Sequence, residues 1–422
     1  MLTKEDNEKL TRVGPGTPMG TLFRRYWLPV LLSEELPERD GAPVRVKALG
    51  EQLVAFRTTD GEVGLIDEFC PHRRASMYLG VNEENGLRCV YHGWKFDREG
   101  RCVDMPTEPP NHRFKDKVRS RAYPVREAAG AIWAYMGPRE LMPAFREFGW
   151  VKAYPAHSHV FKMLEECNFA QAIEGGLDMA HAPILHRRIP ISTRGLPNTG
   201  IIDDGSPQTT DDLSPRTYVQ HTAYGLRLIS EQVKDSQTDV VAIIPFVPPA
   251  FTLVPPFNQT SGERMVNFWM PRDDTSTWHI QWLYSTNASP LNIERRIAIG
   301  GHWVDQNYRK LRNIDNDYLL DRKAQKTRNF SGMEGIVTED HAVNETQGPI
   351  MDRTLERLGA IDVAVIAMRR MLLRAAKDAM EGREPPGLRC NAFDRIQSER
   401  LEKSRAVPWQ DASPLIREFQ NA

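Results

Sequence analysis

The segment that decides the fold runs from Cys70-Pro71-His72 to Cys89-Val90-Tyr91-His92. Sixteen residues separate the two parts, and each part supplies one cysteine and one histidine. A zinc finger normally takes two cysteines from one loop and two histidines from the other. The mixed pairs therefore indicate a different kind of metal site, in which each of two loops contributes one thiolate and one imidazole.

Two such loops match the ligands of a Rieske [2Fe-2S] centre, in which one iron takes two thiolates and the other takes two imidazoles. A cluster of this type relays single electrons. The competing interpretations are a zinc ribbon and a chance grouping of buried cysteines and histidines. We predict a Rieske cluster bound by Cys70, His72, Cys89 and His92.

A second group of metal-binding side chains lies in the segment EECNFAQAIEGGLDMAHAPILHRR, residues 165–188. Glu174, Asp178 and His181 are spaced i, i+4 and i+7, which predicts that they share one face of a helix. Pro183 is expected to break this helix, so that the chain turns and both His181 and His186 reach one metal. Asp178 would then hydrogen-bond the second nitrogen of a ligand imidazole.

Two histidines need a carboxylate to complete the facial triad of non-heme iron(II) oxygenases, which keeps positions open for dioxygen. The segment Thr338–Glu345 supplies three carboxylates, and spacing alone does not choose among Glu339, Asp340 and Glu345. The simpler interpretation of the two histidines is a surface or core pair that binds no metal.

The composition favours a soluble enzyme. The chain has 422 residues, a net charge of −1 and no basic block, which argues against nucleic-acid binding. The start, MLTKEDNEKL, is charged, and no apolar run is long enough to cross a bilayer, so we expect a cytoplasmic protein without membrane contact. Five cysteines in so long a chain argue against a disulfide framework. Three of them have no partner at ligand spacing and are expected to be buried thiols: Cys102, Cys167 and Cys390.

The strand patterns predict two β-rich regions in an α+β protein. Short β-type runs fill residues 44–125, with turns at Thr59-Asp60-Gly61 and Arg98-Glu99-Gly100. A second set of strands from 216 to 286, with a turn at Arg272-Asp273-Asp274, predicts one curved antiparallel sheet.

Three regions have a helical pattern: Leu164–Ala182, Ile293–Lys326 and Ile361–Met380. The last has an apolar face made of Ile361, Val365, Met368, Leu372 and Ala376. We therefore divide the chain into an N-terminal segment (1–43) that packs near the catalytic domain, an all-β Rieske domain (44–150) and a catalytic domain (151–422).

Together the motifs resemble the α-subunit of Rieske non-heme iron ring-hydroxylating oxygenases. Both Cys70-Pro-His72-Arg with Cys89-Val-Tyr-His92-Gly-Trp and Glu174-x3-Asp178-x2-His181-x4-His186 match that family in order and spacing. The phthalate dioxygenase-like group is more similar still, through Arg24-Arg25-Tyr26-Trp27, Asp321-Arg322 and Gly348-Pro349-Ile350-x-Asp352-Arg353-Thr354.

The resemblance implies a β-only Rieske domain, a helix-grip catalytic domain with long helices on an antiparallel sheet, and a head-to-tail homotrimer. It selects Asp340 to complete the mononuclear Fe(II) site with His181 and His186. It also implies that Asp178 bridges subunits, between the cluster of one and the iron of the next. A separate NAD(P)H-dependent reductase would supply electrons for the reaction of O2 with a small aromatic substrate.

The sequence departs from phthalate dioxygenases at the expected substrate-binding strand. Residues Asp239–Pro245 carry no arginine, whereas that group uses arginines there to bind both carboxylates of its substrate. We therefore favour oxidative O- or N-demethylation, or monooxygenation, of a substituted aromatic acid. Ring cis-dihydroxylation of a phthalate- or benzoate-like acid is the alternative. Four arginines remain as partners for a substrate carboxylate: Arg187, Arg188, Arg194 and Arg216.

Two other classes compete with the oxygenase interpretation. A pure Rieske electron-transfer protein would lack mononuclear iron, and a zinc protein would be colourless. The second histidine-carboxylate group and the length of the chain argue against the first of these classes.

Overall fold

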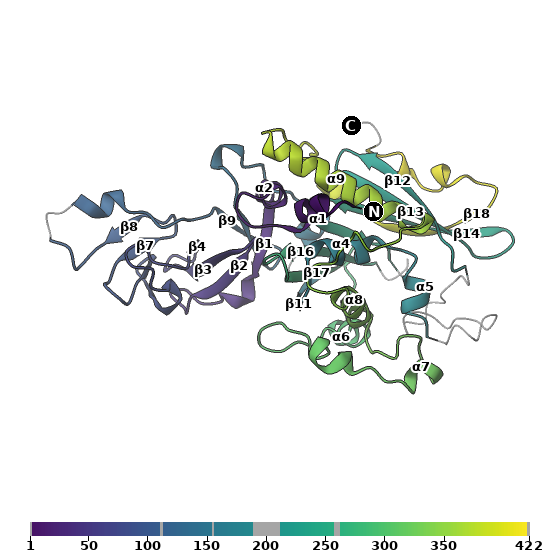
Figure 1. The fold of residues 1–422 in the computed structure, drawn as a ribbon, viewed down its shortest axis with the longest axis horizontal. Coiled ribbons are helices and arrows are strands. Elements are labelled where there is room, and N and C mark those ends of the chain that lie inside the picture. Colours follow the sequence, from purple (N-terminus) through teal and green to yellow (C-terminus); the bar gives the residue numbers. More distant parts are fainter. Residues whose placement is uncertain (1, 110–112, 154–155, 189–211, 257–261, 420–422) are drawn as a thin grey trace.

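The computed structural model describes residues 2–109, 113–153, 156–188, 212–256 and 262–419. The molecule is elongated, with small β-sheets at one end and a large sheet with its helices at the other (Figure 1). No helix in these ranges has the length and apolar character needed to cross a membrane.

Three small antiparallel sheets have the orders β2-β3-β4, β5-β6-β7-β8 and β1-β10-β9. Both predicted hairpin turns are confirmed, because Gly61 links β3 to β4 and Gly100 links β7 to β8. Their φ angles of +92° and +77° are ones that glycine adopts readily. The strands span β1 (Trp27–Leu32), β2 (Val44–Ala48), β3 (Glu51–Arg57), β4 (Val63–Asp67), β5 (Val81–Glu83), β6 (Gly86–Arg88), β7 (Lys95–Asp97), β8 (Cys102–Asp104), β9 (Val125–Ala128) and β10 (Ala131–Tyr135).

The large sheet is antiparallel and has eight strands in the order β11-β17-β16-β15-β14-β13-β12, with β18 paired to β14. It confirms the sheet predicted from residues 216–286, including the turn between Pro271 and Thr277. Strands β11 and β18 join it from outside that stretch. The strands span β11 (Ser158–Glu165), β12 (Arg216–Thr222), β13 (Gly225–Val233), β14 (Thr238–Val247), β15 (Phe251–Val254), β16 (Glu263–Pro271), β17 (Thr277–Ser285) and β18 (Glu399–Ser404).

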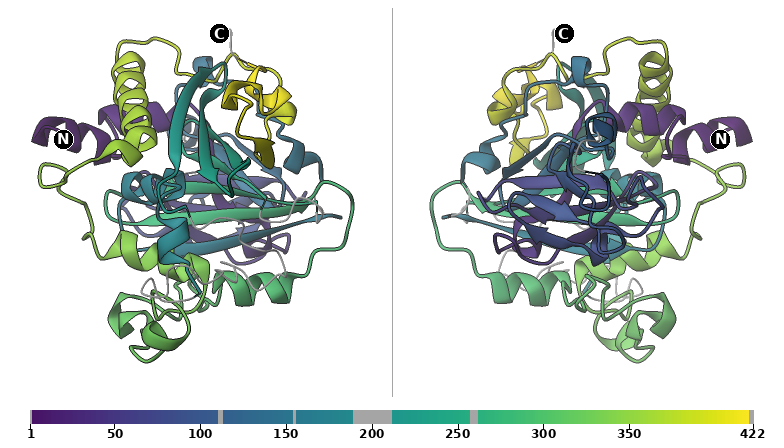
Figure 2. Two further views of the ribbon diagram at one scale, coloured as in Figure 1. Left: turned by 90° about the vertical axis from the view of Figure 1, so that its right-hand side faces the viewer. Right: turned by 90° about the vertical axis from the view of Figure 1, so that its left-hand side faces the viewer.

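Helix α9 (Val363–Met380) confirms the third predicted helix and covers part of the large sheet (Figures 1 and 2). Four residues of its predicted apolar face are buried, as expected for a helix that packs on a core: Val365, Met368, Leu372 and Ala376. Ile361 precedes the helix and is exposed. From the other end of the chain, α1 (Lys4–Thr11) and α2 (Pro18–Arg24) pack beside α9.

The other two helical regions were predicted too long. Leu164 and Glu165 lie in β11, and α4 (Phe169–Leu177) begins only after Asn168, whose side chain accepts the Ala170 N–H as an N-cap. The region Ile293–Lys326 contains two short helices, α6 (Ile293–Gly300) and α7 (Ala324–Thr327). Gly301, with a φ of +69°, ends α6.

Candidate functional site

The predicted cluster ligands lie on two loops with matching backbone hydrogen bonds. In the first loop, the Cys70 N–H donates to Ala75 O and the Arg74 N–H donates to Cys70 O. The second loop repeats both bonds, because the Cys89 N–H donates to Trp94 O and the Gly93 N–H to Cys89 O. Arg74 and Gly93 occupy equivalent places and both have positive φ. The two loops therefore hold their cysteines in matching backbone turns, whereas the histidines lie two residues after Cys70 and three residues after Cys89.

These four side chains suit a cluster that needs two thiolates and two imidazoles. Cys70 and Cys89 are buried, and the ring centroids of His72 and His92 lie 4.5 Å apart. Burial, with Cys89 close by, raises the pKa of Cys70 to about 11, so positive charge from a metal is needed to hold a thiolate there. Nδ1 of His92 is buried and has no hydrogen-bond partner among the described residues, as expected of an atom that binds a metal.

Trp94 packs against the imidazole of His72. The two rings are stacked, with centroids 4.3 Å apart and an angle of 9° between their planes. Trp94 belongs to a small core beneath the loops, with Phe56, Ile66 and Phe96 among its members. The aromatic ring covers one side of the cluster site and limits access of water to it.

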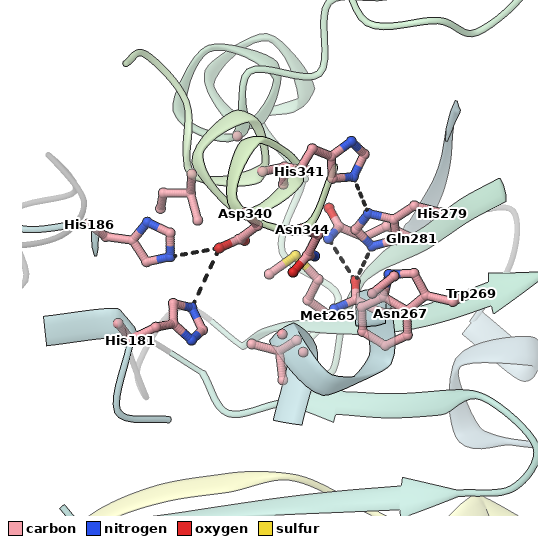
Figure 3. A pocket seen from close by; sticks show the side chains of 18 of the residues that line it. His181, His186, Met265, Asn267, Trp269, His279, Gln281, Asp340, His341 and Asn344 are labelled. Atoms are coloured by element: carbon pink, nitrogen blue, oxygen red, sulfur yellow. Dashed lines mark hydrogen bonds and ion pairs between the residues drawn. The ribbon is translucent and has the colours of Figure 1, made fainter. Parts of the chain in front are cut away.

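The second set of predicted ligands meets at one point in the large domain (Figure 3). Oδ1 of Asp340 lies 3.5 Å from Nε2 of His181 and 3.2 Å from Nε2 of His186. The two imidazole planes are nearly perpendicular, at 82°. His181 and His186 flank helix α5 (Ala182–Leu185), and Asp340 lies on α8 (Ile336–Glu345). A metal with three facial ligands fits this arrangement.

The local route of the chain differs from the one predicted. Helix α4 ends at Leu177 and Asp178 is its C-cap, so Glu174, Asp178 and His181 do not share one continuous helix face. Pro183 does not break a helix but lies in the first turn of α5, where its missing N–H costs nothing. His181 and His186 come together because they lie at the two ends of this single helical turn.

Glu174 has no part in the metal site. Its carboxylate is buried and accepts hydrogen bonds from Arg353 and Arg369 at 2.8–2.9 Å. Burial by itself would raise the pKa of Glu174, but the two guanidinium groups hold it below the ordinary value. These bonds tie α4 to α9 and to the loop before it, and so fix the helix that leads to Asp178.

Asp178 orders the turn before His181. Its carboxylate accepts the N–H groups of Ala180 and His181 at 2.8 and 3.2 Å. Its Oδ2 lies 3.5 Å from Nδ1 of His181, which is longer than a normal hydrogen bond. The predicted bond to the imidazole is therefore present only as an electrostatic contact.

Sequence spacing did not choose among three candidate carboxylate ligands, and the structure gives them different surroundings. Asp340 faces both histidines, whereas Glu339 lies on the other side of His186 with Oε2 2.6 Å from Nδ1. Glu345 points away from the histidines and accepts hydrogen bonds from the Tyr318 hydroxyl and the Glu166 N–H. Glu339 is a site residue whose contact with His186 the sequence reasoning missed.

The charges at this site are arranged for a cation. Burial by itself would lower the pKa of His181, but Asp178 and Asp340 raise it to about 10. The pKa of Asp340 is well below its ordinary value, because His186 and His181 offset the cost of burial. Without metal the carboxylates hold protons on the imidazoles, and a divalent cation can take the place of that positive charge.

A cavity of about 140 Å³ opens beside His181, His186 and Asp340. A space of roughly 150 Å³ is large enough to hold one benzene molecule. Apolar side chains form much of its wall, and the sheet supplies several of them: Phe161, Ile244, Val254, Met265 and Leu283. The cavity is therefore large enough for a single aromatic ring next to the candidate metal ligands.

One wall of the cavity is made of polar side chains, with His279, Gln281 and Asn267 labelled in Figure 3. Burial lowers the pKa of His279 to about 3 and raises that of Glu165 to about 8. His279 contacts His341 and Asn267 at 3.1 Å, and Gln281 donates to Asn267 at 2.8 Å. The sequence carried a signal for this wall, because His279 and Gln281 alternate with apolar residues along β17 and so face the same side.

Comparison with known proteins gives five further findings. Residues 26–124 match the Rieske [2Fe-2S] domain, and residues 134–407 match the family described as LigXa C-terminal domain like. The oxygenase subunit of phthalate 4,5-dioxygenase from Pseudomonas putida is 39% identical, over 97% of this chain and 94% of that subunit. The oxygenase subunit of 5,5'-dehydrodivanillate O-demethylase from Sphingobium sp. is 32% identical, over 92% of this chain and 84% of that subunit. Dicamba monooxygenase bound to 3,6-dichlorosalicylic acid has a similar fold, with a TM-score of 0.59 at 20% identity, over 86% of this chain and 99% of that one.

Proposed function

The chain belongs to the Rieske non-heme iron ring-hydroxylating oxygenases of the phthalate dioxygenase-like group, and we propose from this the roles of its two ligand sets. It is the oxygenase component of a system that uses O2 and receives electrons from a separate protein. In our proposal the [2Fe-2S] cluster is bound by Cys70, His72, Cys89 and His92. The mononuclear Fe(II) is bound by His181, His186 and Asp340.

One observation carries this proposal: His181, His186 and Asp340 lie close together at the wall of a cavity that is large enough for one aromatic ring. Iron(II) on such ligands supplies dioxygen chemistry at the positions that the protein leaves open. Glu339 holds the His186 imidazole so that Nε2 faces Asp340. The apolar walls position an aromatic substrate and keep bulk water away from the reacting carbon.

We further propose that the protein works as a head-to-tail homotrimer. In the elongated chain the two ligand sets belong to opposite ends, with the cluster loops beside β7 and the triad on α5 and α8 (Figure 1). A neighbouring subunit can bring its own cluster close to the triad of this one. Asp178 is partly exposed next to His181, which suits the predicted role of a bridge between subunits. An NAD(P)H-dependent reductase is the proposed electron source.

The proposed substrate is a substituted aromatic acid that undergoes O- or N-demethylation or monooxygenation. A one-ring cavity and the apolar strand β14, which offers no arginine at residues 239–245, support this substrate class. The 32% identity to an O-demethylase subunit also supports it. Ring cis-dihydroxylation is the second candidate, because the phthalate 4,5-dioxygenase subunit is 39% identical to this chain.

The first experiment is anaerobic purification, followed by visible and low-temperature EPR spectra before and after dithionite. Iron and acid-labile sulfide are assayed on the same sample. We expect a brown protein with about three irons per chain, two in the cluster and one mononuclear, and a Rieske-type signal on reduction. Two irons per chain would indicate an electron-transfer protein, and a colourless zinc protein would overturn the oxygenase proposal.

The second experiment assigns the reaction. The purified oxygenase is combined with a reductase and NADH and is offered 3-methoxybenzoate, with formaldehyde and diol products measured together. Formaldehyde in proportion to the NADH consumed supports demethylation, and a cis-diol supports the second candidate. His181→Ala is the control variant, which should keep the Rieske signal and form neither product.

A further inference from the structure

Arg400 lines the same cavity as His181, His186 and Asp340, although it lies far from them in the sequence. It is on strand β18, opposite Ala242 of β14. Side chains of directly opposed residues in an antiparallel pair point to the same face of the sheet. Ala242 and Ile244 belong to the main core, whereas Leu401 packs with Ile243 on the other face. The strand register therefore directs Arg400 toward the cavity.

Arg400 has no partner in the parts of the chain that the structure describes. Its guanidinium forms no hydrogen bond or ion pair there, although the side chain is partly buried. Burial lowers the pKa of Arg400, and no carboxylate of the described residues offsets this effect. A desolvated guanidinium without a counter-ion destabilises the fold. Such a group is typical of a site that binds an anion from outside the chain.

Every other arginine or carboxyl group on the described cavity wall has a partner. Arg296, the other arginine there, pairs with Glu263. Asp178 and Asp340 face the histidines, and Glu165 accepts a hydrogen bond from Asn344 at 2.9 Å. Arg400 is thus the one cavity arginine in the described ranges that is left to bind a ligand.

The arginines proposed from the sequence do not fill this role. Arg216 pairs with Glu231 and Asp239, at 3.1 and 3.6 Å. Arg187 and Arg188 are not part of the described cavity wall. Arg194 lies outside the described residues.

We propose that Arg400 binds the carboxylate of the substrate, and that the substrate carries a single carboxylate. This inference rests on the proposed oxygenase function and extends it by naming the anchor and the charge of the substrate. A guanidinium presents two parallel N–H groups that match the two oxygens of one carboxylate. A dicarboxylate such as phthalate would leave its second charge without a cation in an apolar space. A monocarboxylate held at Arg400 keeps its ring in the cavity that borders the metal site.

The test is isothermal titration calorimetry on the purified, iron-loaded protein. The probes are 3-methoxybenzoate, its neutral isostere 3-methoxybenzamide, and phthalate. We expect the wild type to bind 3-methoxybenzoate more tightly than either of the others. Arg400→Gln should weaken binding of the acid by at least about thirtyfold and leave binding of the amide within a few-fold. Arg400→Lys should restore part of the affinity for the acid, and Arg374→Gln, on the exposed face of α9, is the matched control.

Thermal unfolding without ligand separates an anchor from a structural arginine. Because Arg400 has no partner among the residues that the structure describes, Arg400→Gln should unfold at the same temperature as the wild type or at a higher one. Three results would each overturn the inference: an unchanged affinity for the acid in Arg400→Gln, a lowered unfolding temperature with equal loss of acid and amide binding, or tighter binding of phthalate by the wild type.

Failure of this inference is distinguishable from failure of the proposed function. If the protein has the Rieske signal and mononuclear iron but Arg400→Gln binds the acid as well as the wild type does, the role of Arg400 is wrong and the oxygenase proposal stands. If binding of the acid depends on Arg400 but the protein contains no iron, the oxygenase proposal is wrong and the anion site stands.

Discussion

Oε2 of Glu339 lies 2.6 Å from Nδ1 of His186, on the far side of the imidazole from Asp340. The hydroxyl of Ser331 donates to the other oxygen of the same carboxylate. All of these groups except Asp340 are buried. The contact with the Glu339 carboxylate favours a proton on Nδ1 of His186, so that Nε2, which faces Asp340, is left to bind a metal.

Glu339→Ala should therefore weaken binding of iron(II). Loss of the group that orients a ligand histidine typically costs about 10- to 100-fold in metal affinity. Iron(II) titration of protein stripped of mononuclear iron measures the effect, and Glu339→Gln, which keeps a hydrogen-bond acceptor, should lose less. Glu334→Ala, at a half-buried glutamate that pairs with Arg312 and Arg328 and does not contact His186, is the control, and the Rieske signal should persist in every variant. Equal affinities for Glu339→Ala and Glu334→Ala would exclude the orienting role.

Substitutions of two buried cysteines in the same small core should have opposite effects on the cluster. Cys89→Ser should abolish the visible colour and the EPR signal, because the cluster needs both thiolates. Cys102 is also buried, and its thiol donates to the backbone oxygen of Asp104. Cys102→Ser should keep the spectrum, with acid-labile sulfide as the measurement. A bleached Cys102→Ser protein would contradict the ligand assignment.

The buried ion pair of Glu174 with Arg353 and Arg369 should stabilise the fold only at sufficiently high pH. The pKa of Glu174 is depressed in the folded state, so its contribution is complete above the unfolded value of about 4.5 and is lost as the pH falls through the folded pKa. Glu174→Gln should lower the free energy of unfolding by about 3 kcal/mol at pH 7. The difference from the wild type should shrink below about pH 4.5, as measured by denaturant unfolding across pH.

The control for this prediction is Glu381→Gln, which removes an exposed ion pair with Arg383. Exposed pairs contribute about 0–1 kcal/mol, so this variant should stay close to the wild type at every pH. A constant difference between Glu174→Gln and the wild type from pH 7 to pH 3 would mean that the carboxylate does not act through its charge.

Gly176 should not tolerate a side chain. A Cβ atom there would lie 2.1 Å from Cη2 of Trp269, a buried ring that lines the cavity and stacks on His279. Gly176→Ala should lower the free energy of unfolding by about 1–3 kcal/mol through overpacking, and should also weaken ligand binding. Gly14→Ala, where no atom lies within 4 Å of the added Cβ, is the matched control in thermal unfolding. A Gly176→Ala protein as stable as Gly14→Ala would show that Trp269 can move without cost.

The sequence predicted strands and hairpin turns more reliably than helix boundaries. The turns at Gly61 and Gly100 have strong local signals, because positive φ favours glycine. Helix boundaries depended on contacts that the local pattern did not carry. Leu164 and Glu165 look helical in sequence but pair with Trp278 and Thr277 in the large sheet. Tertiary pairing overrides local propensity there.

The sequence by itself predicted the two proposed ligand sets. Residue type and close spacing are enough to predict that two side chains reach the same metal when they lie close in the chain. Cys70 and His72 lie on one loop, and His181 and His186 lie at the two ends of one helical turn. Tertiary structure decided which distant groups join them. Glu339, Asp340 and Glu345 are neighbours in sequence, but the direction of each side chain from α8 sends only Asp340 toward both histidines. Arg400 reaches the cavity through the pairing of β18 with β14, a long-range register for which the sequence around it holds no signal.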